Sequence, residues 1–269
     1  MRRFFALFIL LFLSTACHAG WDEVEFTGYF SVGAGYQRAL IGPVDPAING
    51  KLLLNLSADL SYGNFFIESD ERRNVLRFGS GIIGYQLWQQ DDSSLALIGT
   101  NYQQAIGPDL VTAFGKQHIA ELEGLELRDS DFLVGLRYQR FWGQHYWAIE
   151  AGQDIESHYG QQLRLLYSYR QQLRNWDLYY NAGVSFSTAK VVDFYYGVRP
   201  AESLVDRPAY QAGAGQQLHI GLSALYPLSP NWLLELGLAV NLFSKAYIDS
   251  PLSNRNSECL SLVKFRYVF

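Results

Sequence analysis

Long apolar runs, cysteine and positive charge are all scarce in this 269-residue chain, and each shortage argues against a class of protein. Beyond residue 20 no apolar stretch approaches the about 20 residues of a membrane-spanning helix, and even segment 232–240 is interrupted by Glu235. Two cysteines, Cys17 and Cys259, are too few for a disulfide-framed fold. A formal net charge of −5 disfavours nucleic-acid partners, which call for a basic surface.

Aromatic residues, by contrast, are abundant. They make up 15% of the chain, whereas charged residues make up only 17%, compared with about 25% in typical soluble domains. The mean hydropathy is nevertheless close to neutral, at −0.05. This combination indicates apolar residues interleaved with polar ones rather than gathered in blocks. Because a closed barrel satisfies its backbone hydrogen bonds internally, it is the remaining way to cross a membrane without helices.

The N-terminus has the layout of a secretory signal peptide. Arg2 and Arg3 precede an apolar run over 4–13, and small and polar residues follow up to Ala19. We expect cleavage after Ala19, leaving a mature chain of residues 20–269 with 19 basic and 26 acidic residues. Lipid attachment at Cys17 is the rival interpretation, although Ser14 stands where lipoprotein signals usually carry a large aliphatic residue.

Alternation of apolar and polar residues recurs along the mature chain, for example over 174–187, 218–226 and 231–243. A period of two predicts strands with one apolar face. Many of these runs are 11 to 14 residues long, whereas strands of soluble proteins average about 5 to 6 and membrane strands need about 9 to 11. The pattern therefore favours a membrane barrel over a soluble one, and the residues predicted to face lipid include Phe132, Val134, Leu136, Trp176, Leu178, Leu234, Leu236 and Leu238.

The predicted connections alternate in length. Short turns are expected at 89–93, 142–144, 171–175 and 227–231, and long loops at 39–50, 107–129, 199–211 and 247–257. Short turns on one rim and long loops on the other are typical of outer-membrane barrels. The sequence thus predicts an all-β fold, a single antiparallel transmembrane barrel of about 12 strands (10–14) forming one domain, with the interval 49–84 the hardest to divide.

The C-terminus resembles the terminal strand signal of outer-membrane barrels. Phe265, Tyr267 and Phe269 share one face of the last strand, and Phe269 is the final residue. This arrangement predicts recognition by the barrel assembly machinery, with outer-membrane lipids as the surroundings.

Residues for catalysis or metal binding are not found in a recognised spacing. His118, His145, His158 and His219 are isolated from cysteine and from one another, and no nucleophile elbow or phosphate-binding glycine loop is present. We therefore expect no catalytic residue, cofactor or metal, and no enzymatic activity. A barrel hydrolase is the least favoured alternative, based only on serines predicted to face the lumen, namely Ser185, Ser187 and Ser223.

Charged residues also fall on the predicted inner face of the central strands. They are Arg137, Arg164, Arg170, Glu150 and Asp177. One interpretation is a charged constriction that selects solutes. The other is internal ion pairing that plugs a narrow barrel, which the small interior of about 12 strands favours.

Four segments resemble those of the MipA/OmpV family, namely 62–66, 195–202, 210–215 and 248–252. The residues that carry the resemblance include Tyr196, Gly197, Val198, Tyr210, Gly213, Asp249, Ser250 and Pro251. The resemblance implies an outer-membrane protein without catalytic residues and a scaffolding role that joins a murein transglycosylase to a murein synthase. Other members are linked to osmotic or pH response, adhesion and antibiotic permeation. We therefore expect a scaffold, with a narrow channel for small solutes or antibiotics as the alternative.

Overall fold

The computed structural model describes residues 24–42, 52–69, 81–112 and 115–269. The predicted signal peptide and its cleavage site after Ala19 lie outside the described residues. Among the described residues, no helix is both long and apolar enough to cross a membrane.

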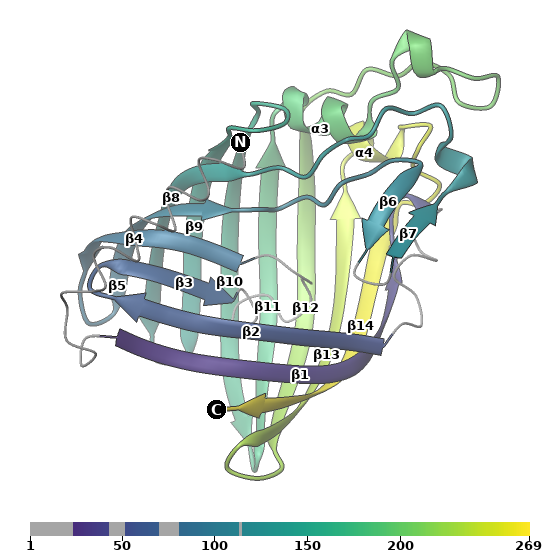
Figure 1. Cartoon of the computed structure of the whole chain (residues 1–269). Helices are drawn as coiled ribbons and strands as arrows, with labels where there is room; N and C mark the ends of the chain where they lie inside the picture. The colour runs from purple at the N-terminus through teal and green to yellow at the C-terminus, as the bar shows by residue number, and fades with distance from the viewer. Residues whose placement is uncertain (1–23, 43–51, 70–80, 113–114) are drawn as a thin grey trace.

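Twelve antiparallel strands form a closed barrel (Figure 1). In chain order they are β1 (Val24–Arg38), β2 (Leu52–Tyr62), β3 (Phe65–Ser69), β4 (Gly81–Gln89), β5 (Ser93–Thr100), β8 (Leu133–Trp142), β9 (His145–Asp154), β10 (Gln161–Leu173), β11 (Trp176–Ser187), β12 (Gly215–Pro227), β13 (Trp232–Phe243) and β14 (Ser257–Val268). The prediction of a single antiparallel barrel of about 12 strands is confirmed. The interval that was hardest to divide holds β3, which has only five residues.

The barrel closes where the first strand meets the last. β1 pairs with β14 so that Val32 lies opposite Phe265, and the backbone N–H of Phe269 donates to the carbonyl of Gly28 at 3.1 Å. The ring of Phe269 lies over Gly28, where a Cβ atom would overlap it. Closure matters because an open strand edge in hydrocarbon leaves backbone groups without partners.

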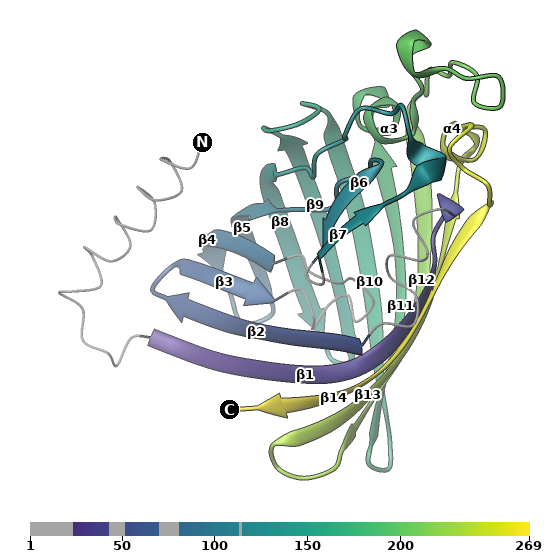
Figure 2. The same ribbon diagram turned by 45° about the vertical axis from the view of Figure 1, so that its right-hand side comes forward.

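The two ends of the barrel differ, as predicted. One end carries short turns and the C-terminus, and two of these turns begin with a glycine at positive φ, Gly63 at 54° and Gly143 at 57°. Such two-residue turns match the twist of the strands they join. The other end carries the long loops, which contain a hairpin and short helices (Figure 1, Figure 2). These elements are β6 (Asp109–Thr112), β7 (Gly115–His118), η4 (Ala120–Leu122), α3 (Ala189–Tyr196), η5 (Pro200–Glu202) and α4 (Lys245–Ile248).

Most strands alternate between an inner face, buried near the middle of the barrel, and an outer face that is mostly apolar and exposed. In β8, Arg137 is 1% exposed whereas its neighbour Leu136 is 46% exposed. Seven of the eight residues predicted to face lipid lie on outward positions of their strands, and Phe132, just before β8, lies over Gly99 on the same side. An exposed apolar belt around a closed barrel is the surface that a bilayer covers.

Aromatic rings gather toward the short-turn end of the outer wall. Rings in contact include Trp88 with Tyr138, Tyr138 with Trp147, Trp176 with Tyr226, and Trp232 with Tyr267. Tryptophan and tyrosine concentrate at membrane interfaces because their rings are apolar and their N–H or O–H groups are polar. This girdle therefore marks one boundary of the membrane-spanning region.

Candidate functional site

The inward-facing arginine of β8 pairs with a carboxylate that lies 69 positions earlier in the sequence. Arg137 donates from both terminal nitrogens to Glu68 of β3, at 3.1 and 3.3 Å. Its guanidinium also lies 5.2 Å from the centre of the Phe66 ring. The charge of Arg137 is thus compensated inside the barrel rather than presented to a passing solute.

A second inward ion pair joins neighbouring strands. Arg164 of β10 lies 3.3 Å from the Glu150 carboxylate of β9, and both side chains are buried. Tyr102 reaches into the barrel from the long loop after β5, where its hydroxyl donates to Glu150 at 2.7 Å. The Tyr102 ring stacks under the Arg164 guanidinium at 4.3 Å. Burial, reinforced by the Glu150 charge, raises the pKa of Tyr102 well above its ordinary value, so that the hydroxyl stays a donor.

Tyr102 is positioned by the carboxylate at the other end of its loop. Asp131 accepts hydrogen bonds from the backbone N–H groups of Tyr102 at 2.7 Å and Gln103 at 2.9 Å. Because Asp131 comes just before β8, the loop between β5 and β8 is tied at its base. This tie directs one aromatic side chain of a long loop, on the end that is extracellular in outer-membrane barrels, toward the paired charges.

A third ion group connects the last two strands. Glu235 of β13 is 0% exposed and contacts two cations of β14, Arg266 at 2.5 Å and Lys264 at 3.3 Å. The ring of Tyr29 lies 5.6 Å from the Arg266 guanidinium. The two remaining predicted lumen charges, Arg170 and Asp177, pair with each other at 2.9 Å near the short-turn rim and are partly exposed. All five predicted lumen charges thus point inward, and each is in an ion pair.

Ser223 is one of the three serines predicted to face the lumen. Ser223 is buried, and its hydroxyl has no hydrogen-bond partner within the described part of the chain. The nearest inward histidine along β12, His219, faces the Asn241 side chain at 2.7 Å instead. Among the described residues, no group of three metal-binding side chains could hold an ion.

The long loops build a small apolar core of their own at the extracellular end. Four loops contribute to this cap, whose buried members are Leu40, Ile41, Ile119, Leu122, Leu125, Val191, Val192, Tyr195, Tyr196, Val198, Ala212, Tyr247 and Leu252. In both ribbon views α3, α4 and the β6–β7 hairpin lie at this end (Figure 1, Figure 2). The sequence pattern predicts loops here but gives no sign of a core.

Most of the family-like residues shape this cap. Val198 pairs with Tyr210 as a backbone bridge, and the buried Ser250 hydroxyl donates to the Tyr196 carbonyl at 2.5 Å. A side chain at Gly197 would overlap Asp193, the residue whose carbonyl ends α3. Asp249 follows the last residue of α4, and Pro251 follows Ser250 in the next turn. A Cβ atom added at Gly213 would meet nothing within 4 Å. The segments therefore hold loops against one another.

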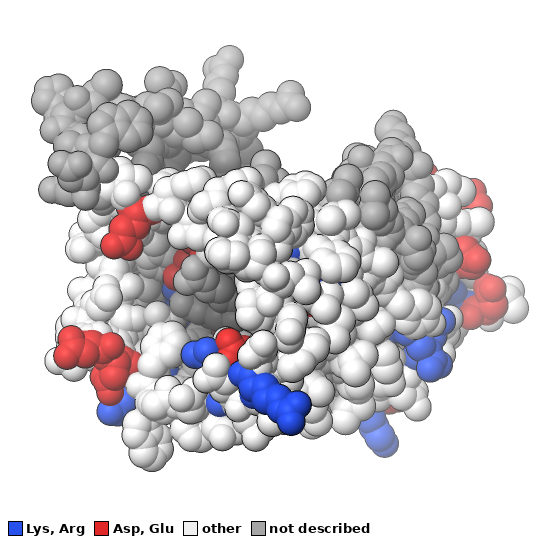
Figure 3. Space-filling view, turned by 90° about the horizontal axis from the view of Figure 1, so that it is seen from below, with Lys and Arg blue, Asp and Glu red and all other residues white. Residues whose placement is uncertain are grey.

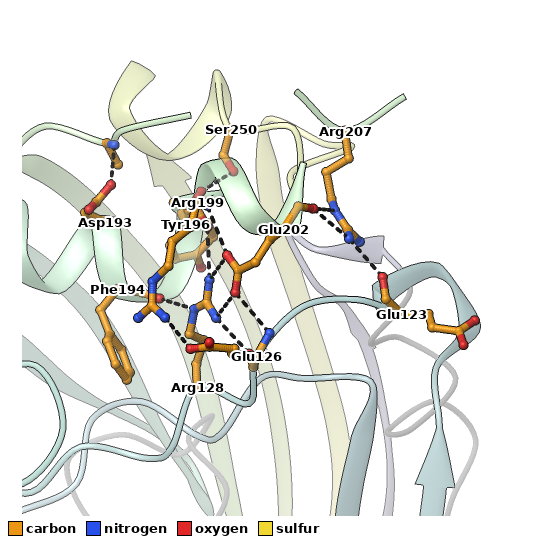
Figure 4. A network of polar contacts seen from close by, with 12 residues as sticks. Glu123, Glu126, Arg128, Asp193, Phe194, Tyr196, Arg199, Glu202, Arg207 and Ser250 are labelled. Carbon is orange, nitrogen blue, oxygen red and sulfur yellow. Dashed lines mark hydrogen bonds and ion pairs between the residues drawn. The ribbon is translucent and has the colours of Figure 1, made fainter. Parts of the chain in front are cut away.

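One buried carboxylate fastens two of these loops together (Figure 4). Glu202 of η5 accepts two hydrogen bonds from Arg128 at 2.6 Å each, and further bonds from the backbone N–H groups of Glu126 and Arg199 at 3.0 Å. Burial alone raises the pKa of Glu202, but these donors, with Arg128 first, outweigh it and lower the pKa to about 2. Glu202 is thus ionised throughout the physiological range.

Arg207 anchors the outermost loop. Its guanidinium donates to the backbone carbonyls of Glu123 at 2.8 Å and Glu202 at 3.0 Å. The turn 204–207 projects beyond this anchor, and Val205 at its tip is fully exposed.

Sequence reasoning did not single out several of these residues. Glu68, Tyr102 and Arg128 stand in segments without clear periodicity, and their partners are 48 to 74 positions away. Glu235 did give a signal, because it is the charged residue that interrupts the apolar run of β13.

The closed antiparallel wall, the apolar belt and the paired lumen charges define an outer-membrane β-barrel. The family model described as MltA-interacting protein MipA matches residues 30–269, and the chain belongs to this family. The resemblance seen in the loop segments is thereby confirmed.

Curated relatives match over a shorter stretch. Outer membrane protein OmpV of Vibrio cholerae serotype O1 is 26% identical over 93 residues, which is 35% of this chain and 36% of the relative. The 24 kDa outer membrane protein of Pasteurella multocida is 28% identical over 89 residues, covering 32% and 35%. The matched stretch thus spans about a third of these relatives.

Solved structures with a similar backbone fold include two porins. The NanC porin has a TM-score of 0.45 and 6% identity, covering 88% of this chain and 98% of the porin. The KdgM porin in complex with disordered oligogalacturonate has a TM-score of 0.42 and 9% identity, covering 90% and 99%.

Proposed function

We propose that this protein is a closed scaffold of the outer membrane that positions murein enzymes at its periplasmic rim. The observation that carries the proposal is the state of the lumen. Arg137, Arg164 and Arg266 are each buried and paired with a carboxylate, and the described long loops pack into an apolar cap at one end. The inner wall of an open diffusion pore is hydrated and its charged side chains are exposed to water. Buried ion pairs and packed loops therefore favour a scaffold over a channel.

The family description supports the same proposal, because it names an MltA-interacting protein. The family resemblance implies that the partner is a murein transglycosylase. The end available to periplasmic partners is the short-turn end. It is mostly uncharged, with small groups of acidic and basic side chains (Figure 3). Trp142 is strongly exposed there, close to the ion pairs of Arg140 with Asp92 and of Arg170 with Asp177. An aromatic ring beside fixed charges is a suitable contact for another protein.

Site-specific photocrosslinking tests this proposal. A crosslinking amino acid at Gln144, in the turn after Trp142, is expected to capture a murein transglycosylase in intact envelopes. The same amino acid at Val205, on the opposite end of the barrel, is the matched control and should capture none. Repeated failure at Gln144 and at the other short turns, with the protein folded, would contradict the scaffold.

A narrow channel is the second candidate. In its favour, the Ser31 and Ser223 hydroxyls and the Nε of Arg137 are buried inside the barrel without a hydrogen-bond partner among the described residues. Such groups are normally satisfied by water or by a polar solute. Planar-bilayer recordings separate the two functions. The scaffold predicts no conductance steps from the refolded protein, whereas regular steps would establish the channel.

We also propose that export proceeds through a cleaved signal peptide. The intact mass of the mature protein is expected to begin at Gly20, after the cut at Ala19. A new N-terminus at a lipid-modified Cys17 would show that the protein is a lipoprotein instead.

A further inference from the structure

The outer wall has a groove on its extracellular half. It spans the upper parts of β8, β9, β10 and β11 and has a volume of about 620 Å³. Its apolar lining includes Leu136, Ala151, Leu163 and Phe186, all on outward positions. The volume lies within the about 300–1,000 Å³ of small-molecule sites, although this one opens sideways onto the bilayer.

The strand register explains the depression. Ala151 lies directly between Leu136 and Leu163 in one outward row. In the next outward row Ile149 occupies the same strand between Tyr138 and Leu165. The Ala151 methyl group leaves a space between the two leucines, whereas the larger Ile149 side chain fills the corresponding space in the next row. Ala151 therefore forms the floor of the groove.

The edge of the groove nearest the long loops is polar. Gln161 donates through its side-chain amide to the Gln153 side-chain oxygen at 3.4 Å, and its backbone N–H donates to the Thr188 hydroxyl at 3.0 Å. Both glutamines are exposed on the outer wall. From the middle of the membrane outward, the groove is thus first lined by apolar side chains and then by amide groups. A lipid has the same order, from its acyl chain to the polar linkage of that chain.

We infer that the groove binds one acyl chain of an outer-leaflet glycolipid, with the Gln153 and Gln161 amides at the amide or ester linkage of that chain. The groove is continuous with the lipid-facing belt and lies beside the long loops, at outer-leaflet depth. A second copy of the chain is the other possible occupant. A symmetric dimer places the same concave surface on both sides, and such a contact buries little apolar area without a matching ridge.

Native mass spectrometry of the full-length folded barrel tests the inference. The protein is reconstituted with lipopolysaccharide and separately with phosphatidylethanolamine and phosphatidylglycerol alone, and is then moved into detergent. We expect one lipopolysaccharide retained per wild-type barrel and no comparable retention of phospholipid. Ala151→Phe fills the floor, and retention should fall about tenfold, since displacing roughly two buried methylenes is enough for that factor.

Ala182→Phe is the matched control. Ala182 is also an outward alanine, on β11, and does not line the groove. This variant should retain lipopolysaccharide like the wild type. Heat-modifiable migration reports folding of each variant, and Gln153→Leu with Gln161→Leu tests the polar edge if Ala151→Phe does not fold.

Three results would overturn the inference. The first is equal retention by wild type and by the groove variants, and the second is equal loss in Ala182→Phe. The third is a wild-type dimer that Ala151→Phe dissociates, because it would identify a second copy as the occupant.

Discussion

The barrel wall and the cap use the same kinds of side chain in opposite ways. On the wall, Leu238 points outward and is 59% exposed, whereas in the cap Leu122 is 2% exposed. The surroundings account for the difference. Hydrocarbon covers the wall, so apolar side chains face out and charges face in, whereas water covers the cap, so its apolar side chains gather inside.

Buried carboxylates follow a common rule in both regions. Glu235 in the wall and Glu202 in the cap are both almost fully buried, and each is held by arginine. A buried charge is tolerated only when it is paired and hydrogen-bonded. The surrounding solvent therefore decides which way apolar side chains point, whereas a buried charge needs a partner in both regions.

The largest effect is expected from removing the wall carboxylate. Glu235→Ala leaves Lys264 and Arg266 buried together without their shared partner, and breaking a buried pair costs about 3–5 kcal/mol. Urea unfolding in lipid vesicles measures the loss. Replacing all three residues by apolar ones should recover most of it. A single variant as stable as wild type would show that the pairing is dispensable.

Charge on the outer wall comes next. Leu236→Arg places a cation on the lipid face of β13, which costs about 2–4 kcal/mol near the bilayer midplane. Val205→Arg, at the water-exposed tip of the cap, is the matched control and should leave the unfolding free energy unchanged. Equal stability of the two variants would contradict the lipid-facing placement of Leu236.

A cavity in the cap should have a smaller and local effect. Leu122→Ala is expected to destabilise the cap by about 2 kcal/mol, the low end for buried leucine, because loops can relax around the gap. Hydrogen exchange should increase in the long loops while the strands stay protected. Faster exchange in the strands would show that cap and wall unfold as one unit.

Low pH is expected to destabilise the cap, because it protonates Glu202. Its pKa is lowered from 4.5 to about 2 in the folded cap, so the Glu202 contribution is fully present above the unfolded pKa and is lost as pH falls toward 2. Limited proteolysis between pH 5 and pH 2 should reveal increasing cleavage of the long loops. Glu202→Gln should flatten this part of the pH dependence. An unchanged profile in that variant would assign the acid sensitivity to other groups.

The smallest effect on stability is expected at the C-terminus. Phe269 is largely exposed, so deleting it should change the unfolding free energy by less than about 1 kcal/mol, within the range of surface changes. We expect instead slower recognition and insertion, measured as less heat-modifiable protein in the outer membrane. Lys264→Ala, on the inner face, should insert more normally. Normal accumulation of the deletion with failure of Lys264→Ala would contradict the predicted faces of β14.

The sequence by itself determined the wall. Side chains alternate between the faces of a strand, so the periodicity around Leu136, Trp176 and Leu236 predicted which residues face lipid. The same alternation placed Arg137 and Arg164 inside. Even the strand number followed, apart from the short β3, whose five residues are too few for a clear period.

The tertiary structure alone decided the partners and the cap. Arg137 meets Glu68 across 69 positions, and Arg128 meets Glu202 across 74. Such pairs form only after the barrel closes and brings distant strands and loops together, so no local pattern records them. Local periodicity reflects the geometry of a single strand, whereas pairing across the lumen and the core of the cap depends on how all the strands are joined.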